Sequence, residues 1–180
     1  RPFSDDSMSC AWDFILEVYM EMVRICIIGG GSRLWAIRFL QDLTLQDKVS
    51  AHVVLYDIDK KAALNNEAVA NEIFKVNGKS NMLSVSVADT LPEGLKGTDF
   101  IIIAIEPGVT DIRKYDLGLP EEYGILQSVG DTTGPGGLMR ARRALPLFFD
   151  FAREIEKYAP DAWVINYTNP MTLCTAALYK

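Results

Sequence analysis

The feature that most constrains the fold is residues 22–32, MVRICIIGGGS, in which a short apolar run ends abruptly in three glycines and a serine. A run of this length, rich in branched side chains and bounded by glycine, predicts a strand buried on both faces. Glycines after such a strand make a tight turn, whose backbone N–H groups can approach a pyrophosphate at the start of the next helix. Gly29, Gly31 and Ser32 are therefore predicted to bind a dinucleotide.

A second apolar run, residues 52–56, ends in Asp57, 26 residues after Gly31. An acidic side chain at this place can bind the adenine ribose hydroxyls, and it favours NAD over NADP. The glycine motif alone is weak, because Leu34 stands where the third glycine of G-x-G-x-x-G is usual. The alternative is a glycine-rich turn in an α/β protein that binds no nucleotide.

The rest of the chain alternates strands with helices. Further strands are predicted at 83–88, 99–105 and 163–167, and helices at 34–45, 60–76, 111–123, 138–159 and 171–180. Asp59 is the predicted N-cap of the second helix, and Asn77-Gly78 ends it. The buried face of that helix is predicted to comprise Leu64, Ala68, Val69, Ile73 and Val76. Right-handed crossovers then give a Rossmann-type parallel sheet of order 3-2-1-4-5, with LSVSVA as an edge strand.

Ligands of such sheets bind beyond the carboxyl ends of the strands, at the switch point between the first and fourth strands. Residues 29–32 and 105–109 should both face this point. Glu106 is therefore predicted to lie near the cofactor. The alternative for Glu106 is a solvated carboxylate at a strand end.

Two polar segments precede the last two helices. GDTTGPGG, residues 130–137, opens a long helix that contains Pro146, and such a glycine loop can bind an anion or sugar hydroxyls. The amides of Asn166 and Asn169 in NYTNP, residues 166–170, suit a neutral polyol or a nicotinamide ribose. The alternatives are a tight turn with a helix cap and an Asx turn.

Composition excludes several classes of partner. A net charge of −6 and a pI of about 4.8 argue against binding to nucleic acid or to an anionic membrane. No apolar stretch is long enough to span a bilayer. The three cysteines show no metal-like spacing, so a reduced, cytoplasmic protein is expected. Residues 1–21 are interpreted as a leader with one amphipathic helix, outside a single domain that spans 22–180.

Four motifs, GGGS, YDID, GDTTGPGG and NYTNP, occur in this order. With them the sequence closely resembles the NAD-dependent glycosidases of glycoside hydrolase family 4, over residues 22–180. The last two motifs are not general features of dehydrogenases. The segment QSVGDTTGPGG most resembles the α-galacturonidase or α-galactosidase branch.

The resemblance implies an uncommon glycoside hydrolysis. NAD oxidises the sugar at C3, a base removes the acidified C2 proton, and the glycosidic oxygen leaves by elimination. Water then adds to C1 and the hydride returns. A divalent metal, usually Mn²⁺, polarises the C2 and C3 oxygens. A glycoside or uronide is the implied substrate, and a homo-oligomer is the usual assembly.

The resemblance also implies roles for individual residues. Gly29, Gly31 and Ser32 would hold the pyrophosphate and Asp57 the adenosine ribose. Asn169 matches a substrate-contacting asparagine, with Asn166 beside it towards the cofactor. Asp131 could assist departure of the leaving group, and Arg113 could bind a uronate carboxylate. Arg140 is a second candidate for that carboxylate.

The metal ligands and the base are expected downstream of residue 180, so no metal ligand is predicted in this chain. Cys174 and His52 are predicted to be structural. The chain thus resembles the cofactor-binding portion of a longer enzyme and is expected to be inactive alone. The alternatives are a 2-hydroxy acid dehydrogenase of the lactate or malate type, and a non-catalytic NAD-binding module.

Overall fold

The fold is a five-stranded parallel sheet between two layers of helices, seen in a computed structural model that describes residues 22–108 and 111–179. Residues 1–21, predicted as a leader, lie outside the described part. The strand order is β3-β2-β1-β4-β5, as predicted, with the LSVSVA strand at one edge. The strands are β1 (Val23–Ile28), β2 (Ala51–Tyr56), β3 (Leu83–Val87), β4 (Phe100–Ile103) and β5 (Trp163–Asn166).

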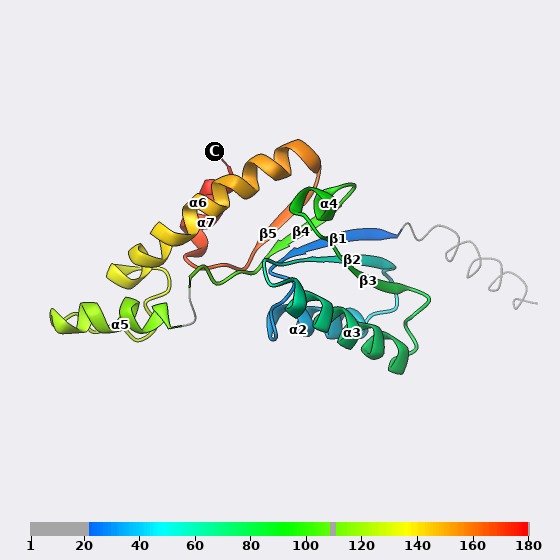
Figure 1. The fold of residues 1–180 in the computed structure, drawn as a ribbon, viewed down its shortest axis with the longest axis horizontal. Helices are drawn as coiled ribbons and strands as arrows, with labels where there is room; N and C mark the ends of the chain where they lie inside the picture. The colour runs from blue at the N-terminus through cyan, green and yellow to red at the C-terminus, as the bar shows by residue number, and fades with distance from the viewer. Residues whose placement is uncertain (1–21, 109–110, 180) are drawn as a thin grey trace, which may run out of the picture.

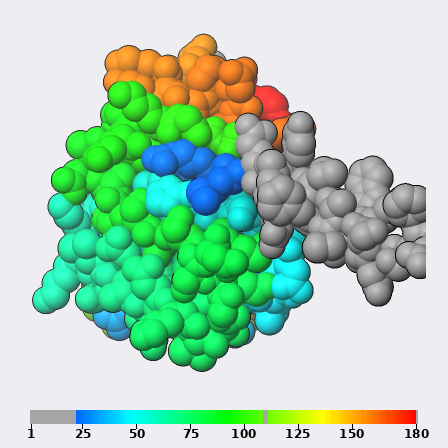
Figure 2. All heavy atoms as spheres, turned by 90° about the vertical axis from the view of Figure 1, so that its right-hand side faces the viewer, coloured from blue at the N-terminus to red at the C-terminus, as the bar shows by residue number. Residues whose placement is uncertain are grey.

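Helices cover the two faces of the sheet unequally. Figure 1 shows α2 (Trp35–Leu43) and α3 (Lys60–Val76) on one face, with α4 (Leu91–Leu95), α6 (Gly134–Tyr158) and α7 (Met171–Leu178) on the other. The remaining helix, α5 (Ile112–Glu122), lies with the start of α6 beyond the carboxyl ends of the strands. Figure 2 looks onto the edge where the strands begin, between the end of α6 above and the segment around α3 and β3 below.

The central strand β1 is buried on both faces, as its composition predicted. Ile25 and Ile27 belong to the apolar core under α2 and α3, whereas Cys26 and Ile28 belong to the core under α4, α6 and α7. This division follows from the alternation of side chains along a strand. The pairs of β1 with β2 and with β4 place the carboxyl ends of three strands side by side.

Helix α3 has the predicted bounds but a different buried face. Asp59 Oδ1 accepts a hydrogen bond from the Ala62 N–H at 3.1 Å, so the predicted N-cap is confirmed, and Gly78 ends the helix with a φ of +67°. The predicted face was wrong, because Leu64, Val69 and Val76 are exposed. The buried residues are Ala63, Asn66, Ala70 and Phe74. Small alanine side chains allow the helix to lie close to the sheet.

The connection between β3 and β4 contains the short helix α4, which was not predicted. Thr90 Oγ1 accepts from the Glu93 N–H at 3.4 Å, and the Glu93 carboxylate accepts from the Asp89 N–H at 3.1 Å. Thr-x-x-Glu is a sequence signal of a helix start, so this helix could have been found. Within the described ranges, no helix is both long and apolar enough to cross a bilayer.

Strand β5 forms the other edge of the sheet, and one of its faces is uncovered. Trp163, Ile165 and Tyr167 are exposed on the side of α2, whereas Val164 packs against the core under α6 and α7. Trp163 is the most exposed of the three, at 74%.

Asn66 links α3 to the glycines that follow β1. Its Nδ2 donates to the carbonyl oxygens of Gly30 and Ser32 at 2.8 and 3.0 Å, and its side chain is buried. We expect Asn66→Ala to lower the free energy of unfolding by about 1–3 kcal/mol, because both carbonyls lose their donor. Chemical denaturation measures this loss. The exposed Asn65→Ala, on the same helix, is the matched control, and equal stability of the two variants would contradict the assigned role.

Candidate functional site

The glycine turn, residues 29–32, joins the carboxyl ends of β1, β2 and β4. The N–H groups of Gly29 and Gly30 donate to Tyr56 O at 2.9 and 3.0 Å, and Ser32 N–H donates to Gly29 O at 3.0 Å. A Cβ at Gly29 would lie 2.2 Å from Ala104 O, and one at Gly30 would lie 2.6 Å from Leu55 Cβ. The turn therefore excludes side chains at these positions because neighbouring strands occupy the space.

Asp57 holds the turn at its outer side. Its Oδ2 accepts from the Gly31 N–H at 2.8 Å and its Oδ1 accepts from the Asp59 N–H at 2.9 Å. The N–H groups of the predicted pyrophosphate donors thus already have partners, which lie in the turn itself, at the end of β2 and at Asp57. In the described part of the chain, the backbone N–H groups of Arg33 and Leu34 have none, so the free donors lie at the start of α2, just after the predicted residues.

A charged cluster, which we define as Glu106, Arg113, Asp131 and Arg140, lies at the ends of β4 and of the loop before α6. Arg140 donates from one nitrogen to Asp131 Oδ1 and from the other to Glu106 Oε2, the latter at 2.7 Å. Arg113 donates to the same Asp131 Oδ1 at 3.0 Å. Glu106, Arg113 and Asp131, which the sequence predicted as site residues, therefore belong to one hydrogen-bonded cluster. Arg140, predicted only as a second candidate for the substrate carboxylate, connects Glu106 to Asp131.

The four members of the charged cluster differ in exposure. The Arg140 side chain is 6% exposed and that of Asp131 20%, whereas those of Arg113 and Glu106 are 49% and 56% exposed. Arg113 and Glu106 can therefore meet a ligand directly. Arg140 lies beneath them, and both terminal nitrogens of its guanidinium donate hydrogen bonds to carboxylates of the cluster.

A second buried ion pair fastens α5 to α6. Arg143 donates from both terminal nitrogens to the carboxylate of Asp116, whose side chain is 3% exposed, and from Nε to Pro107 O at 3.4 Å. The bond to Asp116 raises the pKa of Arg143. This planar, two-point pairing fixes α5, which carries Arg113, relative to the end of β4.

Gln127 fills the loop that leads into α6. Its Oε1 accepts from the Gly136 N–H at 3.1 Å, and its side chain occupies the space beside Gly130, Gly134 and Gly136. A Cβ on Gly130 would lie 2.9 Å from Gln127 Nε2. Part of the glycine content of GDTTGPGG thus has a packing explanation, which matches the simpler interpretation of this loop as a tight turn before a helix.

The NYTNP turn meets the loop before α6. Asn169 Oδ1 accepts from Thr132 Oγ1 at 3.4 Å and from the Met171 N–H at 3.2 Å. The buried Thr168 accepts at Oγ1 from the Ile105 N–H at 3.0 Å, which attaches the turn to the end of β4. Asp131 and Asn169 therefore lie on the same side of the molecule.

Asn166, predicted to contact the cofactor, makes several local hydrogen bonds. Its Nδ2 donates to Thr168 O, Met171 O and Thr175 Oγ1, and its Oδ1 accepts from the Thr168 N–H at 2.8 Å. The amide is thus used to hold the start of α7 against β5. The predicted contact of Asn166 with the cofactor stays a prediction, and the structure shows a local role because the side chain faces α7.

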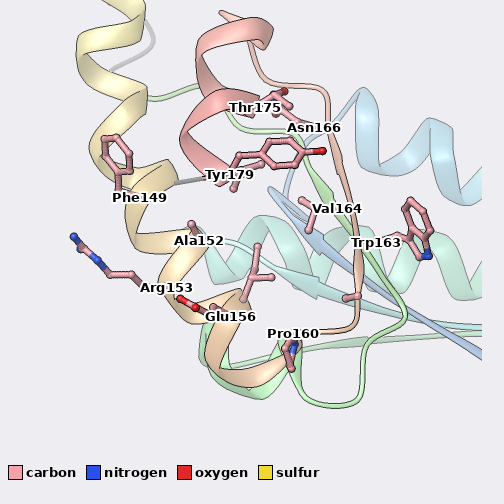
Figure 3. Close-up of a pocket in the computed structure, with 13 residues that line it drawn as sticks. Phe149, Ala152, Arg153, Glu156, Pro160, Trp163, Val164, Asn166, Thr175 and Tyr179 are labelled. Atoms are coloured by element: carbon pink, nitrogen blue, oxygen red, sulfur yellow. The ribbon is translucent and has the colours of Figure 1, made fainter.

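A cavity of about 690 Å³ lies away from the charged cluster, between α6, β5 and α7 (Figure 3). It is lined by Phe149, Val164, Asn166, Thr175 and Tyr179, among others. A smaller hollow of about 110 Å³ lies on the other face of the sheet, where Trp35 and Tyr167 stack with ring centroids 5.5 Å apart. We assign the candidate site to the carboxyl edge and not to the larger cavity, because charged and glycine-rich segments come together at this edge.

Cys174 and His52, predicted to be structural, lie within the fold, as does Cys26. Cys26 and Cys174 are buried free thiols, and burial raises their pKa values to about 12 and about 11. His52 is held between Ser84 Oγ and Ser86 Oγ at 2.8 and 2.9 Å, and burial lowers its pKa. In the described residues, no three His, Cys, Asp or Glu side chains are grouped so that they could hold a metal ion.

Arg140, Asp116 and Gln127 are the residues that sequence reasoning underrated or missed. The sequence contained one signal of the buried position of Arg140. The buried side of α6 carries residues at intervals of three and four, namely Gly137, Arg140, Ala144 and Phe148. An arginine on such a face requires an acidic partner, since buried charges are paired.

The sheet order, the glycine turn after the first strand and the acidic residue that ends the second define a Rossmann-type dinucleotide-binding fold. The GDTTGPGG and NYTNP loops at its carboxyl edge distinguish the chain from dehydrogenases of the same fold. The chain belongs to the family described as "Family 4 glycosyl hydrolase", whose sequence model matches residues 24–180. The resemblance read from the four motifs is thereby confirmed.

Individual relatives agree with this assignment. The chain is 52% identical over 161 residues to an alpha-galacturonidase of Thermoanaerobacter italicus (strain DSM 9252 / Ab9), an alignment covering 89% of this chain and 34% of the relative. It is similar to the crystal structure of lplD from Bacillus subtilis, with a TM-score of 0.82, 45% identity, and coverage of 88% and 35% of the two chains.

A third relative was solved with bound cofactors. It is a 6-phospho-alpha-glucosidase from gut microorganisms, in complex with NAD and Mn²⁺, with a TM-score of 0.76, 28% identity, and coverage of 88% and 35% of the two chains. This chain spans about a third of the length of these relatives.

Gly137 in the first turn of α6 determines how closely Thr132, the residue after Asp131, approaches that helix. A Cβ at Gly137 would lie 2.6 Å from the Thr132 carbonyl carbon. We expect Gly137→Ala to lower the free energy of unfolding by about 1–3 kcal/mol, because backbone must shift to make room. Gly118→Ala in α5, where a Cβ meets nothing within 4 Å, is the control. It should be neutral or stabilising by about 0.5–1 kcal/mol. A fully tolerated Gly137→Ala in chemical denaturation would contradict this packing.

Proposed function

We propose that this chain is the NAD-binding portion of a glycosidase that cleaves α-galacturonides. The observation that carries the proposal is the carboxyl edge of the sheet, where the glycine turn held by Asp57 adjoins the β4 end that carries the charged cluster. The family match and the alpha-galacturonidase relatives support the same reaction class. α-Galactosides are the second candidate substrate, since an alpha-galactosidase of Bacillus subtilis is 32% identical over 161 residues.

The residues at the glycine turn fit a dinucleotide. Side chains are excluded at Gly29 and Gly30, so a ligand can approach the backbone closely. Asp57 would accept hydrogen bonds from the adenine ribose hydroxyls. The pyrophosphate would lie at the start of α2, where the N–H groups of Arg33 and Leu34 are the donors and the helix dipole favours an anion. Glu106, at the end of β4, would face the nicotinamide half.

The substrate would lie against the charged cluster and the NYTNP turn. The half-exposed Arg113 guanidinium suits the carboxylate of a uronic acid, because its planar fork can donate two parallel hydrogen bonds. Asn169 would contact the sugar hydroxyls. Asp131 Oδ1 accepts from two guanidinium groups, so Oδ2 is the oxygen available to a sugar hydroxyl or to the leaving group.

The proposed chemistry is oxidation at C3, loss of the C2 proton, elimination of the leaving group, addition of water and reduction back. Bound NAD supplies the reversible hydride acceptor for this sequence. The charged cluster orients the sugar and holds Asp131 near the scissile bond. We propose that Mn²⁺ and the base that removes the C2 proton are bound and supplied by residues outside this chain, because the described residues contain no grouping that fits a metal. The chain alone is therefore expected to be inactive.

The Asp57 carboxylate should determine which dinucleotide binds. Asp57→Asn removes the charge that accepts from the ribose hydroxyls and repels a 2′-phosphate. We expect about a 10- to 100-fold loss of NAD affinity and a gain in NADP affinity in calorimetry on the longer protein that contains this chain. Asp161→Asn, an exposed substitution at the opposite edge of the sheet, is the control. An unchanged ratio of NAD to NADP affinity in Asp57→Asn would contradict the proposed ribose contact.

Arg113 should discriminate galacturonides from galactosides. In the longer protein with NAD and Mn²⁺, we expect Arg113→Gln to lower kcat/KM for a nitrophenyl α-galacturonide by about 10- to 100-fold, since a charge-assisted hydrogen bond is lost. The α-galactoside rate should change little. Lys114→Gln, its exposed neighbour, controls for surface charge. Equal losses on both substrates would show that Arg113 does not read the carboxylate.

A further inference from the structure

Arg140 occupies an unusual place in the charged cluster, because it is a buried cation that contacts two carboxylates from different segments. Its nitrogens donate to Glu106, three residues beyond β4, and to Asp131, in the loop before α6. Its side chain is 6% exposed. Burying a charge is costly unless it is paired. Arg140 therefore requires both carboxylates, and both carboxylates require Arg140.

The surroundings of Arg140 place it beneath the site. Its charge acts on the thiol of Cys174 in α7, where it partly offsets the increase in pKa that burial causes. The hydrogen bonds of the guanidinium place it between the end of β4 and the Asp131 loop. It is enclosed by protein, in contrast to the half-exposed Arg113, which donates to the same oxygen of Asp131.

We propose that Arg140 is a positioning residue, which fixes Asp131 on the substrate side and Glu106 on the cofactor side as one unit without touching the sugar. The inference rests on the proposed function of the same site. It differs from the prediction that Arg140 binds the substrate carboxylate, because both of its terminal nitrogens already have partners. The exposed Arg113 retains that role.

The charges indicate what removal of Arg140 would do. The cluster contains two carboxylates and two guanidinium groups, so its net charge is zero. Without Arg140, Glu106 makes no ion pair in the described part of the chain and feels only the more distant charge of Arg143, and Asp131 keeps only Arg113. Neither carboxylate is then held by a cation that also holds the other, so Asp131 leaves its position relative to the bound sugar. Misplacement of a reacting group by about 1 Å can cost about 100-fold in rate.

The test uses the longer glycosidase that contains this chain, with NAD and Mn²⁺. Arg140→Gln should lower kcat about 100-fold with little change in KM, because the effect is on geometry and not on binding. The kcat of Arg140→Lys should fall between that of Arg140→Gln and that of the wild type. An ammonium is a point charge and cannot orient two carboxylates as a planar guanidinium does. Arg142→Gln and Arg142→Lys are the controls, because Arg142 lies on the same helix, exposed and outside the cluster.

A double-mutant cycle separates positioning from a general loss of structure. If Arg140 acts through its partners, then Glu106→Gln in the Arg140→Gln background should lower kcat by less than it does alone. Hydrogen exchange gives a readout that is independent of activity. In Arg140→Gln, peptides 104–108 and 130–133 should exchange faster than in the wild type, whereas peptides from α3 should not.

Three results would overturn the inference. They are a kcat within about twofold of the wild type in both Arg140 variants, an increase in KM at constant kcat, and strictly additive effects in the cycle. If Arg140→Gln does not fold, Arg140→Lys and Glu106→Gln decide the question. If the wild type does not act on galacturonides, the proposed substrate fails, and the same variants are compared on whichever glycoside it cleaves.

Discussion

The close approach of the glycine turn to the neighbouring strands is the constraint on which the rest of the structure depends. Gly29 and Gly30 lie against β4 and β2 so closely that a Cβ at either would overlap backbone or side-chain atoms. Asp57 and Asn66 hold the same turn from β2 and α3. Because these contacts fix the turn, the start of α2 presents its free N–H groups at the carboxyl edge of the sheet.

The charged cluster is the second element of the site, and it follows from the same topology. Parallel strands place the ends of β4 and β5 beside one another, so Glu106 and the NYTNP turn meet there. Helix α6 runs back along the sheet from this edge, and its first turns contribute Arg140 and Arg143. Each arginine pairs with carboxylates that are distant in sequence, which fixes the loop before α6 and helix α5.

Most of the fold could be predicted from the sequence, because strand composition, glycine positions and crossover handedness each point to one topology. The buried face of α3 could not, since periodicity did not distinguish Leu64 and Val69 from Ala63 and Ala70, and close packing against the sheet favours alanine. The site was predicted in outline, from residues at strand ends. The pairing of Arg140 and the local role of Asn166 depend on side-chain directions, which sequence spacing does not give.

A crystal structure of the longer protein with NAD is the most direct test of the claim that the carboxyl edge binds the cofactor. The account predicts adenine ribose hydroxyls within hydrogen-bonding distance of the Asp57 carboxylate, and a pyrophosphate at the N–H groups of Arg33 and Leu34. Adenosine bound instead in the cavity between α6, β5 and α7, or Asp57 without any contact to the dinucleotide, would contradict it.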